Sequence, residues 1–253
     1  MGVCVNMLDS SPALKVIARA LLLALFAGPA QAAPALATTE HSATLASLFA
    51  PEEAAALSKT LPLDQPVKFR AWLSETKNPG VLIFVSPTDS GEPPAGWLPL
   101  LESHQMSWIA ADGFGNRKPS AQRVLAAMMA LAFVGKLAET DPGRIYLGGM
   151  SGGGRIASQT VTRFPQNFSG AVYIVGADFW MPKDIRLRDR AAANRYVFIT
   201  GERDFNRREM RRVFARYRSS GLTRSLLMDL PDFGHAYPDA GQLGEALDFL
   251  DAR

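Results

Sequence analysis

Cysteine is nearly absent from this sequence. Among its 253 residues only Cys4 carries a thiol, and Cys4 lies in the stretch assigned below to a cleaved leader. The rest of the chain can form no disulfide, although disulfides are a common means of stabilising exported proteins. We therefore expect the fold to depend on its hydrophobic core, for which a hydrophobic fraction of 47% is sufficient.

An excess of charge of one sign is also missing. The chain has 27 basic and 24 acidic residues and a formal net charge of +3, which is too small to indicate nucleic acid as a partner. Several arginines do cluster within residues 207–218. Acidic residues lie nearby, so a solvated helix face is the simpler interpretation, and contact with an anionic surface is the alternative.

The first 32 residues have the features of a secretory signal peptide. Lys15 and Arg19 precede the apolar run ALLLALFAG at 20–28, and Ala-Gln-Ala at 30–32 fits a signal peptidase site. The apolar run is too short to span a bilayer as a helix. We expect cleavage after residue 32, with Met7 as an alternative start, and a periplasmic or secreted protein with no membrane span after cleavage.

Short apolar runs alternate with helical patterns from residue 67 onward, which predicts an α/β fold with a mostly parallel sheet and helices on both faces. One domain over 67–253 accounts for this part, although two are possible. Residues 33–66 precede it as a lead-in, flexible over 33–41 and helical over 45–61. The predicted strands are 67–73, 81–86, 106–112, 144–150, 170–177, 195–201 and 225–230, and the predicted helices are 119–139, 153–164, 207–221 and 240–253.

Ser151 lies in a glycine-rich turn between a predicted strand and a predicted helix. The sequence GMSGG at 149–153 fits G-x-S-x-G, a nucleophile elbow in which small neighbours allow the strand and the helix to approach. A phosphate-binding turn is the alternative, but neither G-K-S/T nor G-x-G-x-x-G is matched here. The setting favours Ser151 as a nucleophile, with the N–H of Gly152 directed at a developing oxyanion.

A serine nucleophile needs a base, and the chain has three histidines. His41 lies in the lead-in, and His104 precedes a strand, on the wrong side of the sheet for chemistry. His235 follows the last strand, as the base does in proteins with this elbow. The matching acid is Asp204, which would orient the imidazole and stabilise its charged form, although capping the next helix is another role for it. Weaker candidates for the acid are Glu202, Asp229 and Asp232.

The second oxyanion donor is expected in the loop after strand 81–86. Pro87 has no N–H, so Thr88 or Ser86 must donate, and we favour Thr88. At the same edge of the sheet, aromatic side chains are candidates for binding an acyl, aryl or sugar group, with packing of the loops as their alternative role. The aromatic candidates are Phe179, Trp180 and Tyr237, with Trp97 and Phe114 nearby.

The chain resembles the α/β-hydrolase superfamily over roughly residues 67–253. The segments FVSPTDSG, DPGRIYLGGMSGGGRIAS, TGERDFN and PDFGHAYP are similar to those of secreted bacterial esterases of the polyhydroxybutyrate-depolymerase and feruloyl-esterase type. This resemblance implies hydrolysis of carboxylic esters through Ser151, Asp204 and His235, without metal or other cofactor. One departure is Ser-Pro at 86–87, where these relatives often have His-Gly. The short segment 178–194 implies an open site, because lids of the superfamily are commonly inserted there.

We therefore expect a serine hydrolase that cleaves a small-molecule or polymer-linked ester through an acyl-enzyme. A peptidase of the same fold is one alternative, although such enzymes usually carry an extra binding domain. A non-catalytic binding protein that retains only the fold is the other. The presence of all three candidate catalytic residues at the expected places argues against it.

Overall fold

In the part of the chain that the computed structural model describes, residues 36–252, eight strands form one sheet in the order β1-β2-β4-β3-β5-β6-β7-β8. β1 pairs antiparallel with β2, and β2 pairs antiparallel with β4. All other neighbours are parallel, so β2 runs against the rest. The predicted leader lies outside the described residues. The strands are β1 (Thr39–Ala43), β2 (Val67–Trp72), β3 (Gly80–Val85), β4 (Met106–Ala111), β5 (Ile145–Met150), β6 (Gly170–Ile174), β7 (Arg195–Gly201) and β8 (Ser225–Leu230).

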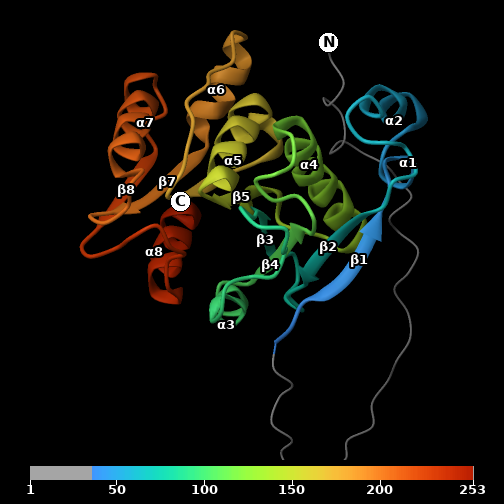
Figure 1. Cartoon of the computed structure of the whole chain (residues 1–253), viewed down its shortest axis with the longest axis horizontal. Helices are drawn as coiled ribbons and strands as arrows, with labels where there is room; N and C mark the ends of the chain where they lie inside the picture. Colours follow the sequence, from blue (N-terminus) through green and yellow to red (C-terminus); the bar gives the residue numbers. More distant parts are fainter. Residues whose placement is uncertain (1–35, 253) are drawn as a thin grey trace, which may run out of the picture. The chain divides into compact units, whose positions relative to one another are not determined.

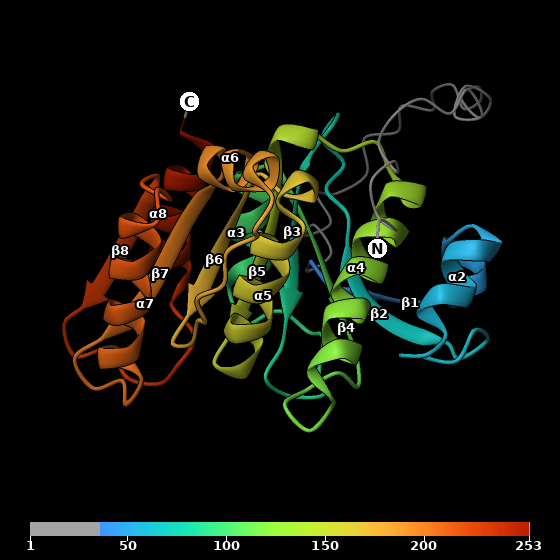
Figure 2. The same cartoon turned by 90° about the horizontal axis from the view of Figure 1, so that it is seen from above.

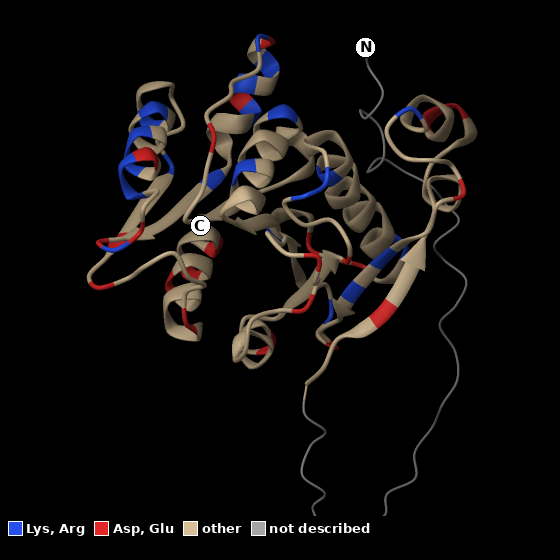
Figure 3. Ribbon diagram, viewed as in Figure 1, with Lys and Arg blue, Asp and Glu red and all other residues tan. Residues whose placement is uncertain are grey.

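Helices cover both faces of this sheet, as the sequence predicts (Figures 1 and 2). One face is covered by α4 (Ser120–Leu137), α5 (Gly152–Arg163) and α7 (Arg207–Ser219), together with the shorter α1 (Leu45–Leu48), α2 (Pro51–Leu57) and α6 (Ile185–Ala193). The other face is covered by α3 (Trp97–Ser103) and α8 (Ala240–Asp251). Short 3-10 helices occupy Pro142–Arg144 and Pro165–Asn167. Lys and Arg gather on α6 and α7 (Figure 3).

The strands and helices predicted from residue 67 onward are all present, with ends shifted by a few residues. Three elements were not predicted, namely β1, α3 and α6. β1 falls partly within the segment expected to be a flexible lead-in, and it forms an edge strand because His41 and its neighbours pair with β2. The segment 45–61, expected to be helical with Pro51 at or near a helix start, forms α1 and α2. Pro51 begins α2, and the residue before a proline is driven to the extended conformation that Ala50 has.

The helix α4 is the one described helix that is long and apolar enough to cross a membrane by length and composition. Leu125, Met129 and Val134 on this helix are buried in the same hydrophobic cluster as side chains of the sheet. Burial of this kind is expected of a helix in the core of an α/β fold.

The sheet creates one place where a site is expected. β3 lies between β4 and β5, so the chain crosses from one side of β3 to the other at this point. In such sheets, ligands bind outside the carboxyl ends of the strands where the strand order reverses. Ser151 follows β5 at this edge. Between β6 and β7 the chain forms only loops and the nine-residue helix α6, so no lid domain is inserted there.

Candidate active site

Ser151 occupies a strained turn between β5 and α5. Its backbone has φ 54° and ψ −120°, a combination that is costly for a residue with a Cβ and that persists only where the surroundings impose it. The two neighbouring glycines explain how the turn is packed. A Cβ at Gly149 would collide with the backbone of Gly153, and a Cβ at Gly153 would collide with the carbonyl oxygen of Val85. The turn therefore holds the Ser151 side chain out from the sheet edge.

The structure brings Ser151, His235 and Asp204 together from three separate loops. The Nε2 atom of His235 lies 2.9 Å from the Ser151 Oγ, and its Nδ1 atom lies 2.9 Å from the Asp204 Oδ1. Both distances are normal for hydrogen bonds. The imidazole therefore connects a buried carboxylate to the serine hydroxyl, which is the arrangement a nucleophilic serine requires.

Asp204 is fixed by more than the histidine. Its side chain is fully buried. Thr200 Oγ1 donates to its Oδ2 at 2.7 Å, and the Asn206 N–H donates to its Oδ1 at 3.0 Å. Asn206, not Asp204, occupies the N-cap position of α7.

The weaker acid candidates have other partners. Asp229 accepts from Arg207, and Asp232 accepts from Arg203. Glu202 accepts a backbone N–H at 3.4 Å. The other two histidines also lie elsewhere. His41 is on the edge strand β1, and His104 ends α3, where its Nδ1 lies 3.8 Å from Asp248.

Phe205 is an aromatic residue of the site that the sequence did not single out. Its ring stacks on the His235 imidazole with centroids 4.0 Å apart and an angle of 22° between the planes. Yet 77% of Phe205 is exposed to solvent, which is rare for so large an apolar side chain. The only signal in the sequence was its position directly after Asp204.

The loop that carries His235 is held by packing on the opposite face. Trp97 is fully buried and donates from Nε1 to the Pro238 carbonyl oxygen at 3.1 Å. The Tyr237 ring packs edge-on against Trp97 and tilted against Phe84. Burial raises the pKa of the Tyr237 phenol, and a hydrogen bond with Ser86 partly offsets the rise. Tyr237, a predicted substrate residue, is therefore half-buried and supports the histidine loop.

The candidate oxyanion donors lie beside the elbow, but they differ in their partners. Gly152 begins α5, so its N–H has no acceptor within the helix. The Thr88 N–H, in contrast, donates to the Ser86 Oγ at 3.2 Å. The side-chain amide of Asn116 lies directly against Gly152, where a Cβ would meet its Oδ1.

Arg123 on α4 ties the strand end, the elbow and a loop together, and the sequence did not reveal it. Only 5% of this residue is exposed. Its guanidinium donates to three carbonyl oxygens, those of Phe114 at 3.0 Å, Ser86 at 3.0 Å and Gly152 at 3.2 Å. Burial lowers the pKa of this guanidinium. Arg123 thus fixes the two peptides that flank the candidate oxyanion site.

Known proteins share this architecture. No protein-family model matches the sequence, and no curated protein matches it significantly. Among solved structures, a ferulic acid esterase superposes with a TM-score of 0.58 at 14% identity, covering 85% of this chain and 98% of that protein. The S-formylglutathione hydrolase of Staphylococcus aureus superposes with a TM-score of 0.57 at 13% identity, covering 84% and 98%. The chain has the α/β-hydrolase fold.

A thermostable esterase also superposes on this chain, with a TM-score of 0.57 at 15% identity and 83% of this chain covered. This chain spans 60% of the length of that esterase. At such identities the likeness concerns the fold. Within the α/β-hydrolase fold, the strand order and the elbow after β5 place Ser151 where the superfamily resemblance predicts a nucleophile.

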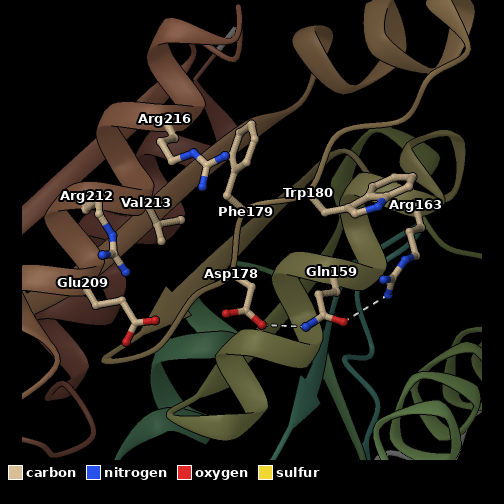
Figure 4. Close-up of a pocket in the computed structure, with 9 residues that line it drawn as sticks. All are labelled: Gln159, Arg163, Asp178, Phe179, Trp180, Glu209, Arg212, Val213 and Arg216. Carbon is tan, nitrogen blue, oxygen red and sulfur yellow. Dashed lines mark hydrogen bonds between the residues drawn. The ribbon is translucent and has the colours of Figure 1, made fainter.

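Two of the predicted substrate residues lie away from Ser151. Phe179 and Trp180 line a pocket with Gln159 and Arg163 of α5 (Figure 4). The chain leaves β6 beside Ser151 but then follows α5, since the Asp178 N–H donates to the Ser158 Oγ at 2.8 Å. The expectation that these aromatics would form the rim of the catalytic site assumed that the loop turns toward the serine. Phe114, also expected nearby, is buried in the core.

A bidentate ion pair joins α5 to α7 next to this pocket. Arg155, one turn after Ser151, donates from Nη1 and Nη2 to the two Glu209 carboxylate oxygens at 2.5 and 2.6 Å. Hydrogen bonding to Arg155 lowers the pKa of Glu209. The lowered pKa means that the pair stabilises the fold above the pKa of the unfolded chain, and that this contribution is lost as the pH falls through the folded pKa.

Glu209→Gln should therefore lower the free energy of unfolding by about 1 kcal/mol at pH 7, a modest value because the pair is partly exposed. At about pH 3, where unfolded glutamates are protonated, the difference from wild type should be smaller. Urea unfolding at both pH values measures this. Glu245→Gln, an exposed helical glutamate in no ion pair with the described residues, is the control. An equal loss at both pH values would contradict the pairing.

Proposed function

We propose that this protein hydrolyses carboxylic esters with Ser151 as nucleophile, His235 as base and Asp204 as the acid that orients it. The observation that carries the proposal is the hydrogen-bonded chain from Asp204 through His235 to a serine in a strained turn. Esterases are among the solved structures that superpose on this chain, which supports the same reaction.

In the proposed reaction, the Ser151 Oγ attacks the ester carbonyl carbon while the His235 Nε2 takes the hydroxyl proton. The N–H of Gly152, with a second donor at Ser86 or Thr88, stabilises the tetrahedral oxyanion. The imidazolium, held by Asp204, gives its proton to the departing alcohol. Water activated by the same imidazole then attacks the acyl-enzyme, which releases the acid and restores Ser151.

The substrate class follows from the openness of the site. Only α6 lies between β6 and β7, where a lid would be inserted, so we propose that the serine accepts small esters or esters attached to a polymer. The exposed Phe205 ring beside His235 offers an apolar surface for the acyl or alcohol group.

Two measurements test this function. The wild-type protein should be labelled by a fluorophosphonate probe and should hydrolyse p-nitrophenyl acetate and butyrate. Faster cleavage of aminoacyl p-nitroanilides than of these esters would favour a peptidase. If the folded wild-type protein is not labelled, the hypothesis of an enzyme would give way to that of a non-catalytic binding protein of this fold.

Removing the Phe205 ring tests the substrate surface. Phe205→Ala should lower kcat/KM for p-nitrophenyl butyrate by about three- to tenfold, since a stacked ring contact is worth about 0.5–1.5 kcal/mol. Phe205→Tyr retains the ring and should stay near wild type. An alanine variant as active as wild type would mean that the ring has no part in the reaction.

We also propose that the protein is exported and acts in the periplasm or outside the cell. The Lys15 and Arg19 charges, the apolar run at 20–28 and Ala-Gln-Ala at 30–32 support this. The mass of the protein recovered from the periplasm or medium should correspond to a chain beginning at Ala33. Recovery of a full-length chain from the cytoplasm alone would contradict it.

A further inference from the structure

A pocket of about 330 Å³ lies between α5, α7 and the segment that follows β6 (Figure 4). Ser151, Asp204 and His235 are not among the residues that line it. Arg163, one of its lining residues, is twelve residues beyond Ser151 on α5, a separation of about 18 Å along a helix. The reaction proposed above uses none of the residues that line this pocket.

The pocket carries an excess of positive charge. Arg163, Arg212 and Arg216 line it together with the carboxylates of Asp178 and Glu209. Arg155 pairs with both of these carboxylates, at 3.3 Å to Asp178 and 2.5 Å to Glu209. Four arginines thus face two carboxylates. The excess amounts to two positive charges at neutral pH.

The three arginines that line the pocket do not form ion pairs with carboxylates of the described residues. They stand in contrast to Arg207 and Arg211 of the same helix α7, which both pair with Asp229. Within the arginine cluster at 207–218, Arg207 and Arg211 are therefore paired, whereas Arg212 and Arg216 face the pocket.

Aromatic and amide groups hold two of these arginines in place. The Arg216 guanidinium lies 4.3 Å from the centroid of the Phe179 ring, and that of Arg163 lies 5.2 Å from the centroid of Trp180. Arg163 also donates to Gln159 Oε1 at 3.1 Å, while Gln159 Nε2 donates to Asp178 (Figure 4). A stacked guanidinium keeps N–H groups at its edge for bidentate bonding to a carboxylate, sulfate or phosphate.

We propose that this pocket binds an organic anion, a ring that carries a carboxylate, sulfate or phosphate group. The arginines would hold the acidic group, and the Phe179 and Trp180 side chains would contact the ring. The anion could be the distal end of the ester substrate or a separate small molecule, and in both cases the pocket binds an acidic group on a ring. Binding does not depend on the proposed ester hydrolysis.

Calorimetric titration of the Ser151→Ala protein tests the pocket without any turnover. Benzoate and glucuronate serve as probes, with benzamide and glucose as their neutral counterparts, all at constant ionic strength. We expect the anions to bind and the neutral compounds not to. Arg212→Gln and Arg216→Gln should each weaken anion binding by about tenfold, the effect of losing one charge-assisted hydrogen bond.

Arg208→Gln is the matched control, because Arg208 is an exposed arginine of α7 that does not line the pocket. It removes the same charge and should leave the affinity unchanged, with all variants melting at similar temperatures. Anions that bind no better than their neutral counterparts would overturn the proposal. An equal loss of affinity in Arg208→Gln would overturn it too, because it would reduce the effect to general surface charge.

Kinetics of the wild-type protein can distinguish an anion that is part of the substrate from one that is a separate ligand. An ester with a carboxylate about 15–18 Å from its carbonyl, matching the helix distance above, is compared with its methyl-capped analogue. A lower KM for the acidic ester, lost in Arg163→Gln, would support the site and identify the anion as part of the substrate. Anion binding by titration with equal KM values would support the site and indicate a separate ligand. If the wild-type protein hydrolyses no ester, the titration with Ser151→Ala still tests anion binding, because it needs no turnover.

Discussion

Ser151→Ala should abolish labelling by a fluorophosphonate and lower kcat for p-nitrophenyl butyrate by about 10⁴-fold or more. The loss follows from the geometry, because the Ser151 Oγ is the hydroxyl at hydrogen-bond distance from the His235 Nε2. Without it there is no atom to attack the carbonyl or to carry the acyl group. Comparison of labelling and steady-state turnover in the two proteins measures the effect.

The second variant, His235→Ala, makes this prediction sharper. Groups that act as one unit are not additive, so Ser151→Ala/His235→Ala should be no slower than Ser151→Ala alone. Ser103→Ala, an exposed serine at the end of α3, is the control and should keep full activity. Labelling that survives in Ser151→Ala would assign the nucleophile to another residue.

The positions of Ser151, Asp204 and His235 could be predicted because each follows a strand of a parallel sheet. Carboxyl ends of parallel strands meet at one edge, so three residues far apart in sequence are brought together by topology alone. The short connection between β6 and β7 indicated the absence of a lid for a similar reason, since its length limits what it can hold.

The directions of loops could not be predicted in this way. Phe179 and Trp180 follow β6 at the expected edge, yet the hydrogen bond from Asp178 to Ser158 leads this segment along α5. α3 was missed because it has only seven residues and no capping side chain at its start, so the burial of Trp97 under the histidine loop was missed too. These outcomes depend on tertiary contacts, which a local pattern does not contain.

Arg123 shows the same limit most clearly. In the sequence it is one polar residue near the start of a long apolar helix, where a solvated position is the ordinary expectation. In the structure its side chain passes inward to the carbonyl oxygens of Phe114, Ser86 and Gly152. Three chain segments meet at this edge of the sheet, and one fork of N–H donors reaches a carbonyl oxygen of each.

Arg123→Met should therefore lower the free energy of unfolding by about 3 kcal/mol or more, because the carbonyls of Phe114, Ser86 and Gly152 lose a charged donor at about 1–3 kcal/mol each. Methionine fills a similar volume, so the loss reflects hydrogen bonding more than a cavity. Urea unfolding measures it. Arg123→Lys keeps a charge with fewer, differently directed donors and should fall between methionine and wild type.

The same variant should also lose activity beyond what unfolding explains. Arg123 holds the carbonyls of Ser86 and Gly152, whose peptides flank the candidate oxyanion site, so their release would misplace the donors. Met129→Ala, a buried residue of the same helix that makes none of these bonds, should cost a comparable 2–5 kcal/mol, roughly, but leave kcat near wild type while the protein is folded. If kcat of folded Arg123→Met also stays at the wild-type value, Arg123 stabilises the fold without positioning the site. A fall in kcat confined to the Arg123 variants would instead show that the carbonyl network is part of what makes Ser151 reactive.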